Sequence, residues 1–308
     1  MKITVVGIGN VGAAVAYTIV LEGLADQLVL INRTQQLAEG HALDLQHAAS
    51  FVKHGVDVSG GEVADSSDSD VVVMAMSVPL AGGVPNRRLL AEGNAKIFAE
   101  WMPKLAAASP QAIFLIVTNP VDAMTWAALK LTDLSWNQVC GIGTIVDSAR
   151  FRTMLSKRLN IHADDIRAYI LGEHGQSQVA AIHRVSVGGE CINQSLEAAH
   201  QLAQSTVNSG ADILRLKGHT NFAVAKATTV VIEAVRSNLH ATMPLSVMLD
   251  GYCGIDDVCL SIPVVVGSRG VSRQMHPDLV DSEFAAFRKS AAEVREVCEQ
   301  IRPFLNLP

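Results

Sequence analysis

The segment that most constrains the fold is a glycine pattern set between a short apolar run and a helical one. Ile3–Val6 is predicted to be a strand, and Gly7-Ile8-Gly9-Asn10-Val11-Gly12 follows it at once. The helical pattern then runs from Val11 to Glu22. In such a turn the first glycine permits a tight bend, the second lets a pyrophosphate approach the backbone, and the third lets helix and strand pack closely. The pattern predicts a dinucleotide site at a helix N-terminus; the alternative is a turn kept for packing alone.

The first half of the chain repeats this alternation of strand and helix. The expected strands are Ile3–Val6, Leu28–Ile31, Val71–Met76 and Ile113–Val117, and the expected helices are Val11–Glu22, Gln35–Ala48 and Arg88–Ala107. The strands are almost wholly apolar, as when helices cover both faces of a parallel sheet. We therefore expect an α/β fold, a Rossmann-type doubly wound parallel sheet, as a dinucleotide-binding domain over residues 1–144.

The pattern changes after about residue 145 to a mixed α+β region. Expected helices are Val146–Leu159, Asn193–Leu216, Ala223–His240 and Ser282–Ile301, and expected strands are Arg167–Leu171, Leu245–Leu249, Val258–Val266 and a pair around Gly188-Gly189. No linker separates the two halves. Residues 145–308 are expected to form the catalytic, substrate-binding domain.

Composition excludes several classes of protein. The net charge of −6 argues against nucleic acid or an anionic membrane as a partner. The five cysteines show no zinc or CxxC spacing, so we expect reduced thiols and no metal. The apolar run at Ile3 is too short for a signal peptide, and no segment is long and apolar enough to span a membrane. These features predict a cytoplasmic protein.

The end of the second strand bears on the choice of cofactor. An acid there would bond the adenosine ribose, but the chain has Asn32 followed by Arg33. Asparagine does not repel a 2′-phosphate, and Arg33 could pair with one. We expect NAD(H) or NADP(H), with NADP(H) favoured. In the alternative, Arg33 is a solvated residue or stacks on adenine, and NAD(H) is bound.

Three residues have the chemistry that hydride transfer to a 2-oxo acid requires. Arginine binds both oxygens of a carboxylate, histidine exchanges a proton near neutral pH, and a buried aspartate orients that histidine. His174 lies between two glycines just past a strand, while Asp147 and Arg150 share one face at the start of a helix. Taken without context, a structural histidine and an ordinary local ion pair are the favoured interpretations.

Four ordered motifs resemble the lactate/malate dehydrogenase family along essentially the whole chain. They are Gly7-x-Gly9-x-x-Gly12, Thr118-Asn119-Pro120-Val121-Asp122, Asp147-Ser148-Ala149-Arg150 and Gly172-Glu173-His174-Gly175. The Gly-Glu-His-Gly-x-Ser-Gln stretch also looks like the L-2-hydroxyisocaproate dehydrogenase branch. The resemblance implies that His174 is the proton donor and acceptor, that Asp147 is its partner, and that Arg150 grips the substrate carboxylate.

The resemblance implies further contacts. Asn119 would bond the substrate oxygen or orient the nicotinamide, and Thr220 would line the substrate pocket. Arg87 would polarise the carbonyl, with Arg88 as a competing candidate. Gly7, Gly9, Asn10, Val11, Gly12, Asn32, Arg33 and Asn119 would contact the cofactor. The family also implies a homodimer or homotetramer.

The residue expected to select the substrate differs from its counterpart in the best-known family members. Six residues before the catalytic arginine, malate dehydrogenases have arginine and lactate dehydrogenases usually glutamine, whereas here the count falls on Ala81. A dicarboxylate would lack its counter-charge, so we expect a monocarboxylate rather than oxaloacetate. A malate dehydrogenase with a displaced arginine, an NAD-dependent glycosidase and a non-catalytic dinucleotide-binding protein are the alternatives.

Overall fold

A nine-stranded sheet runs through the computed structural model, which describes residues 1–79, 87–192 and 196–307. Its strand order is β14-β13-β12-β6-β5-β4-β1-β2-β3. The six parallel strands are β1 (Lys2–Val6), β2 (Gln27–Ile31), β3 (Asp57–Gly61), β4 (Val71–Met74), β5 (Ile113–Ile116) and β6 (Val139–Gly141). Their order, 3-2-1-4-5-6, is that of a dinucleotide-binding sheet, so the predicted fold class is confirmed.

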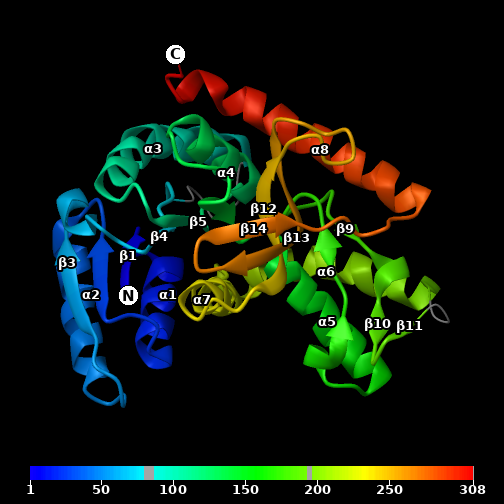
Figure 1. Cartoon of the computed structure of the whole chain (residues 1–308), viewed down its shortest axis with the longest axis horizontal. Helices are drawn as coiled ribbons and strands as arrows, with labels where there is room; N and C mark the ends of the chain where they lie inside the picture. Colours follow the sequence, from blue (N-terminus) through cyan, green and yellow to red (C-terminus); the bar gives the residue numbers. More distant parts are fainter. Residues whose placement is uncertain (80–86, 193–195, 308) are drawn as a thin grey trace.

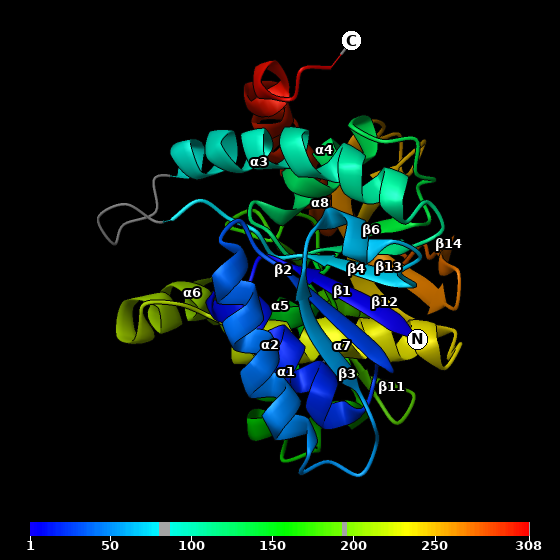
Figure 2. The ribbon, with the colours of Figure 1, turned by 90° about the vertical axis from the view of Figure 1, so that its left-hand side faces the viewer.

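Helices cover both faces of this sheet (Figure 2). On one side lie α1 (Asn10–Glu22), α2 (Gln35–Ala49) and α7 (Phe222–Arg236), and on the other lie α3 (Arg87–Ala108), α4 (Val121–Lys130) and α8 (Asp281–Ile301). The strands between them are almost wholly buried because both faces are covered. Trp126 and Phe98, on α4 and α3, are among the largest fully buried side chains.

The second half of the chain extends the same sheet. Antiparallel strands β12 (Ala241–Leu249), β13 (Val258–Gly267) and β14 (Gly270–Gln274) join it where Ser246 pairs with Gly141 of β6. The division expected near residue 144 thus falls beside a continuous sheet, and it stays a prediction.

The remaining elements lie beside that sheet (Figure 1). They are the helices α5 (Ile145–Leu159) and α6 (Leu196–Lys217), the strands β7 (Ile166–Arg167), β8 (Ile170–Leu171), β9 (Val179–Ala180), β10 (Ser186–Val187) and β11 (Glu190–Cys191), and the 3-10 turns Val63–Ser66, Ala163–Asp165, Ile182–Arg184 and Arg302–Phe304. Across the described ranges, no helix combines the length and apolar character needed to cross a membrane.

Two predicted elements differ in the structure. The strand expected over Arg167–Leu171 is divided, because β7 pairs with β10 whereas β8 pairs with β9. The helix expected to reach His240 ends at Arg236. Asn238 and His240 both have positive φ, a left-handed conformation that cannot continue a right-handed helix.

The glycine turn between β1 and α1 is tightly packed at its two ends. Gly7 has φ +97°, and a Cβ there would lie 2.4 Å from the backbone nitrogen of Met76. A Cβ on Gly12 would lie 2.0 Å from the carbonyl oxygen of Gly7. Both positions exclude any side chain for reasons of fold alone, which explains the first and third glycines of the motif.

Gly12→Ala is expected to lower the free energy of unfolding by about 1–3 kcal/mol, the usual cost of overpacking. Denaturant unfolding followed by circular dichroism measures this change. Gly40→Ala is the matched control, since Gly40 lies within α2 and an added Cβ there meets no atom within 4 Å. It should raise stability by up to about 1 kcal/mol through helix propensity. A Gly12→Ala protein as stable as the parent would refute the packing role.

Candidate active site

The predicted chemical residues gather beyond the carboxyl ends of the parallel strands. Asn119 follows β5, Asp147 lies in the first turn of α5, and His174 lies in the turn between β8 and β9. Ligands of open α/β sheets bind at this edge. The sheet and the second half of the chain together therefore position the site.

His174 and Asp147 form a short hydrogen-bonded pair. Nδ1 of His174 donates to Oδ2 of Asp147 over 2.6 Å. Burial alone would lower the pKa of the imidazole, but the charge and hydrogen bond of Asp147 outweigh it and raise that pKa. Nε2 has no hydrogen-bond partner among the described residues. A protonated His174 can therefore present Nε2 as a donor.

Arg150 uses the other oxygen of the same carboxylate. Its Nη1 donates to Asp147 Oδ1 over 2.9 Å, with both side chains largely buried. Burial tends to raise the pKa of Asp147, but the charges and hydrogen bonds of His174 and Arg150 hold it below its usual value. The local ion pair considered from the sequence is thus present, and it is part of the larger cluster.

A narrow cavity of about 40 Å³ joins four of the predicted residues. It is lined by Val117, Asn119, Val121, Ile142, Val146, Arg150, His174, Thr220 and Val224. Apolar side chains thus surround one guanidinium, one imidazole, one amide and one hydroxyl. This combination suits a small ligand with a carboxylate and a second oxygen.

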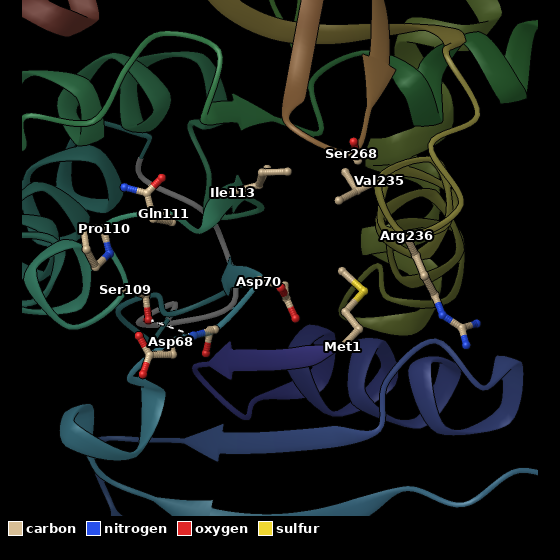
Figure 3. Close-up of a pocket in the computed structure, with 11 residues that line it drawn as sticks. Met1, Asp68, Asp70, Ser109, Pro110, Gln111, Ile113, Val235, Arg236 and Ser268 are labelled. Carbon is tan, nitrogen blue, oxygen red and sulfur yellow. Dashed lines mark hydrogen bonds between the residues drawn. The ribbon is translucent and has the colours of Figure 1, made fainter.

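A larger cavity lies elsewhere. It has a volume of about 480 Å³ and lies at the amino ends of β1, β4 and β5, the edge opposite the candidate site (Figure 3). Its charged lining residues are Asp68, Asp70 and Arg236. None of the residues predicted for chemistry or cofactor binding lines it, so cavity size does not locate the candidate site.

The middle of the glycine turn is open. A Cβ on Gly9 would meet no atom within 4 Å, so the fold alone does not require glycine there. Asn10 and Val11 begin α1, whose N-cap residue, Gly9, offers no side chain to its free N–H groups. The residues present therefore fit a pyrophosphate, which needs both an open backbone and unpaired N–H donors.

Asn32 directly follows β2, at the same edge of the sheet. Its Oδ1 accepts a hydrogen bond from the Ile8 N–H over 3.2 Å, and its Nδ2 donates to the Thr34 carbonyl over 3.3 Å. The side chain thus connects the second strand to the glycine turn. Arg33 beside it is exposed.

Two predicted residues cannot be placed. Ala81 lies outside the described residues, and so does the side chain of Arg87, although its backbone begins α3. The competing Arg88 is exposed and pairs with Glu92, four residues along the same helix, over 2.9 Å.

The structure adds residues that sequence reasoning did not identify. The His174 N–H donates to Oδ2 of Asp122 over 2.8 Å, and the Glu173 N–H donates to Oγ of Ser290 over 2.7 Å. Glu173 in turn accepts from the Ser177 hydroxyl over 2.6 Å. Asp122 was visible as part of a motif and as an acid in the first turn of α4, but Ser290 lies 117 residues from Glu173 and gave no signal.

Comparison with protein families gives two adjoining matches. Residues 1–141 match the lactate/malate dehydrogenase, NAD binding domain, and residues 144–305 match the lactate/malate dehydrogenase, alpha/beta C-terminal domain. These matches confirm the family resemblance. The L-2-hydroxyisocaproate branch stays a prediction.

Individual relatives align over nearly their full length. The L-lactate dehydrogenase of Acetivibrio thermocellus is 34% identical, covering 97% of both chains. That of Synechococcus sp. is 36% identical, covering 98% of this chain and 100% of the relative. The crystal structure of the minor L-lactate dehydrogenase from Enterococcus mundtii superposes with a TM-score of 0.93 at 31% identity over 98% of both chains. The chain therefore belongs to the lactate/malate dehydrogenase family.

Proposed function

We propose that this protein transfers a hydride between a nicotinamide cofactor and C2 of a small 2-oxo or L-2-hydroxy acid. The observation that carries the proposal is the 2.6 Å pair of His174 and Asp147, with Arg150 and His174 on the wall of one cavity. The glycine turn that fits a dinucleotide lies at the same edge of the sheet. A cofactor bound there would donate or accept the hydride.

His174 acts as the acid and base in this proposal. During reduction, Nε2 gives its proton to the carbonyl oxygen as that oxygen gains negative charge, and during oxidation the neutral ring takes a proton from the hydroxyl. Asp147 keeps Nδ1–H oriented and stabilises the imidazolium. The raised pKa of the imidazole favours the protonated form of His174, which is the form that reduction requires.

Arg150 binds the substrate carboxylate in the same scheme. Only Nη1 has a described bond, to Asp147, so the other N–H groups of its planar fork can meet two carboxylate oxygens. Asn119 and Thr220 would contact the substrate on the remaining walls of the cavity. The role of Arg87 in polarising the carbonyl rests on the sequence resemblance.

A monocarboxylate is the substrate class we favour. Arg150 is the single arginine among the described residues that line the cavity, and the other described lining residues include no lysine. The relatives that match most of the chain are L-lactate dehydrogenases, and Ala81 offers no charge. These points disfavour a malate dehydrogenase with a displaced arginine.

NADP(H) is the cofactor that we favour, and NAD(H) is the alternative. Asn32 carries no negative charge and Arg33 is exposed at the same edge, which supports acceptance of a 2′-phosphate. The description of the matching N-terminal family model supports NAD(H).

The oligomeric state is also a proposal. Exposed apolar side chains lie along α1, α2 and α7, including Tyr17, Leu43 and Phe222. They offer a surface for a second copy in a homodimer or homotetramer, as the family implies.

A screen of reduced cofactors against 2-oxo acids tests the proposed activity. Absorbance at 340 nm should fall with pyruvate or a bulkier monocarboxylate such as 2-oxoisocaproate, and much more slowly with oxaloacetate. Preferred turnover of oxaloacetate would assign the protein to the malate dehydrogenases. Turnover of no 2-oxo acid would favour the non-catalytic dinucleotide-binding protein.

His174→Asn should reduce kcat by at least about two orders of magnitude, the typical contribution of a positioned acid or base. Cofactor affinity, measured by fluorescence titration, should change little. His183→Asn is the matched control, because His183 also pairs with a carboxylate, Glu283, over 3.0 Å but does not line the cavity. The acid–base assignment fails if the His174 variant keeps normal turnover.

Asn32→Asp should lower the ratio of kcat/KM for NADPH to that for NADH by about tenfold or more, since a carboxylate bonds ribose hydroxyls and repels a 2′-phosphate. Aspartate keeps the oxygen that accepts the Ile8 N–H. Arg33→Ala should weaken the binding of NADPH and leave the binding of NADH unchanged. A parent enzyme that strongly prefers NADH, with a ratio unmoved by Arg33→Ala, would contradict the NADP(H) preference.

A further inference from the structure

Asp122 supplies a second buried carboxylate next to His174, in addition to that of Asp147. It lies in the first turn of α4 and is 3% exposed. Its Oδ2 accepts the backbone N–H of His174, while Oδ1 has no hydrogen-bond partner among the described residues. The Ser246 hydroxyl, on β12, is likewise buried and makes no hydrogen bond of good geometry with the described residues, but it lies near enough to lower the pKa of Asp122.

The groups that interact electrostatically with Asp122 come from the turn after β8 and from three elements packed against α4. His174 and Glu173 face it from the turn after β8, Ser246 from β12, Cys259 from β13 and Cys298 from α8. Asp147 and Arg150 of α5 also act on the charge of the imidazole. Among the side chains that shift the pKa of Asp122, His174 is thus the one that can carry a positive charge.

The single backbone N–H of His174 does not by itself require a charged acceptor. A neutral acceptor would satisfy His174 N–H without the cost of burying a charge. Burial raises the pKa of the Asp122 carboxyl to about 7, against the opposing effects of Ser246 and His174. The charge of Asp122 in turn raises the pKa of His174. The protonation of Asp122 and the protonation of His174 are therefore expected to influence each other.

We propose that Asp122 is a positioning residue for the reaction: its buried carboxylate fixes the turn that carries His174 through the 2.8 Å hydrogen bond to Oδ2, and it places a second acidic group beside Asp147 in the surroundings of the imidazole. This inference rests on the proposed function for its catalytic meaning. The effect of Asp122 on the protonation of His174, however, can be measured with or without turnover.

Asp122→Asn separates the two roles, because asparagine keeps an oxygen for the His174 N–H but removes the charge. Without that charge the pKa of His174 falls. Reduction requires protonated His174, so the alkaline limb of the kcat/KM profile for the 2-oxo acid should move to lower pH by roughly 0.5–1 unit. Turnover on the acid side should stay within a few-fold of the parent. Asp122→Ala, which loses both roles, should lower kcat at every pH.

A direct titration makes the test independent of activity. In the full-length protein labelled with [13C]histidine at Cε1, the His174 resonance is assigned by its loss in His174→Asn. Its midpoint should fall in Asp122→Asn. Asp257→Asn is the matched control, because Asp257 accepts from Trp126 of α4 and pairs with Lys130 at the far end of that helix. This control should leave the His174 midpoint unchanged.

Ser246→Ala is a second variant that tests the same interaction if Asp122→Asn does not fold. The Ser246 hydroxyl lowers the pKa of Asp122, so its loss should leave Asp122 less charged at pH 7 and move the His174 midpoint down by a smaller amount. An unmoved midpoint in a folded Asp122→Asn protein, or in Ser246→Ala where the former fails to fold, overturns the inference. A parent protein that turns over no 2-oxo acid but shows the shift would refute the proposed function alone.

Discussion

The Asp147 carboxylate is the charge on which the candidate site depends. One oxygen accepts from His174 over 2.6 Å and the other from Arg150 over 2.9 Å. A buried carboxylate without partners would cost several kcal/mol, and these two hydrogen-bond donors compensate for that cost. Its place in the first turn of α5 adds the favourable effect of the helix N-terminus. One buried charge thus fixes the proton donor and the guanidinium relative to each other.

The parallel half of the fold could be predicted because its strands are buried on both faces. β1, β2, β4 and β5 are nearly continuous apolar runs with glycine, asparagine or proline close after them. β3, with the sequence Asp-Val-Ser-Gly-Gly, and the three-residue β6 carry no such pattern. Their identity as strands comes from pairing with β2 and β5, and pairing partners cannot be found from local composition.

The site was predictable only as residue types joined by a family resemblance. His174 and Asp147 are 27 residues apart, and no local pattern says that they meet. Asp122 resembles any acid in a first helical turn, and Ser290 resembles any polar residue of an amphipathic helix. Their contacts with the His174 turn depend on how α4 and α8 pack, which is decided by the whole fold. The positions assigned to Ala81 and to the Arg87 side chain remain predictions from the sequence.

A single strand sets where the acid–base pair forms. Ser261 of β13 exchanges backbone hydrogen bonds with Gly172 over 2.9 and 3.0 Å, two residues before His174. Its hydroxyl accepts the Thr144 N–H over 3.0 Å, just before the helix that carries Asp147. Ser261 is fully buried within the continuous sheet. The starting points of both elements are therefore tied to one rigid strand, and rigid elements hold reacting groups more closely than loops do. Because β13 belongs to the second half of the chain and the sheet runs on into the first, the same strand also keeps the pair in register with the edge where the glycine turn lies.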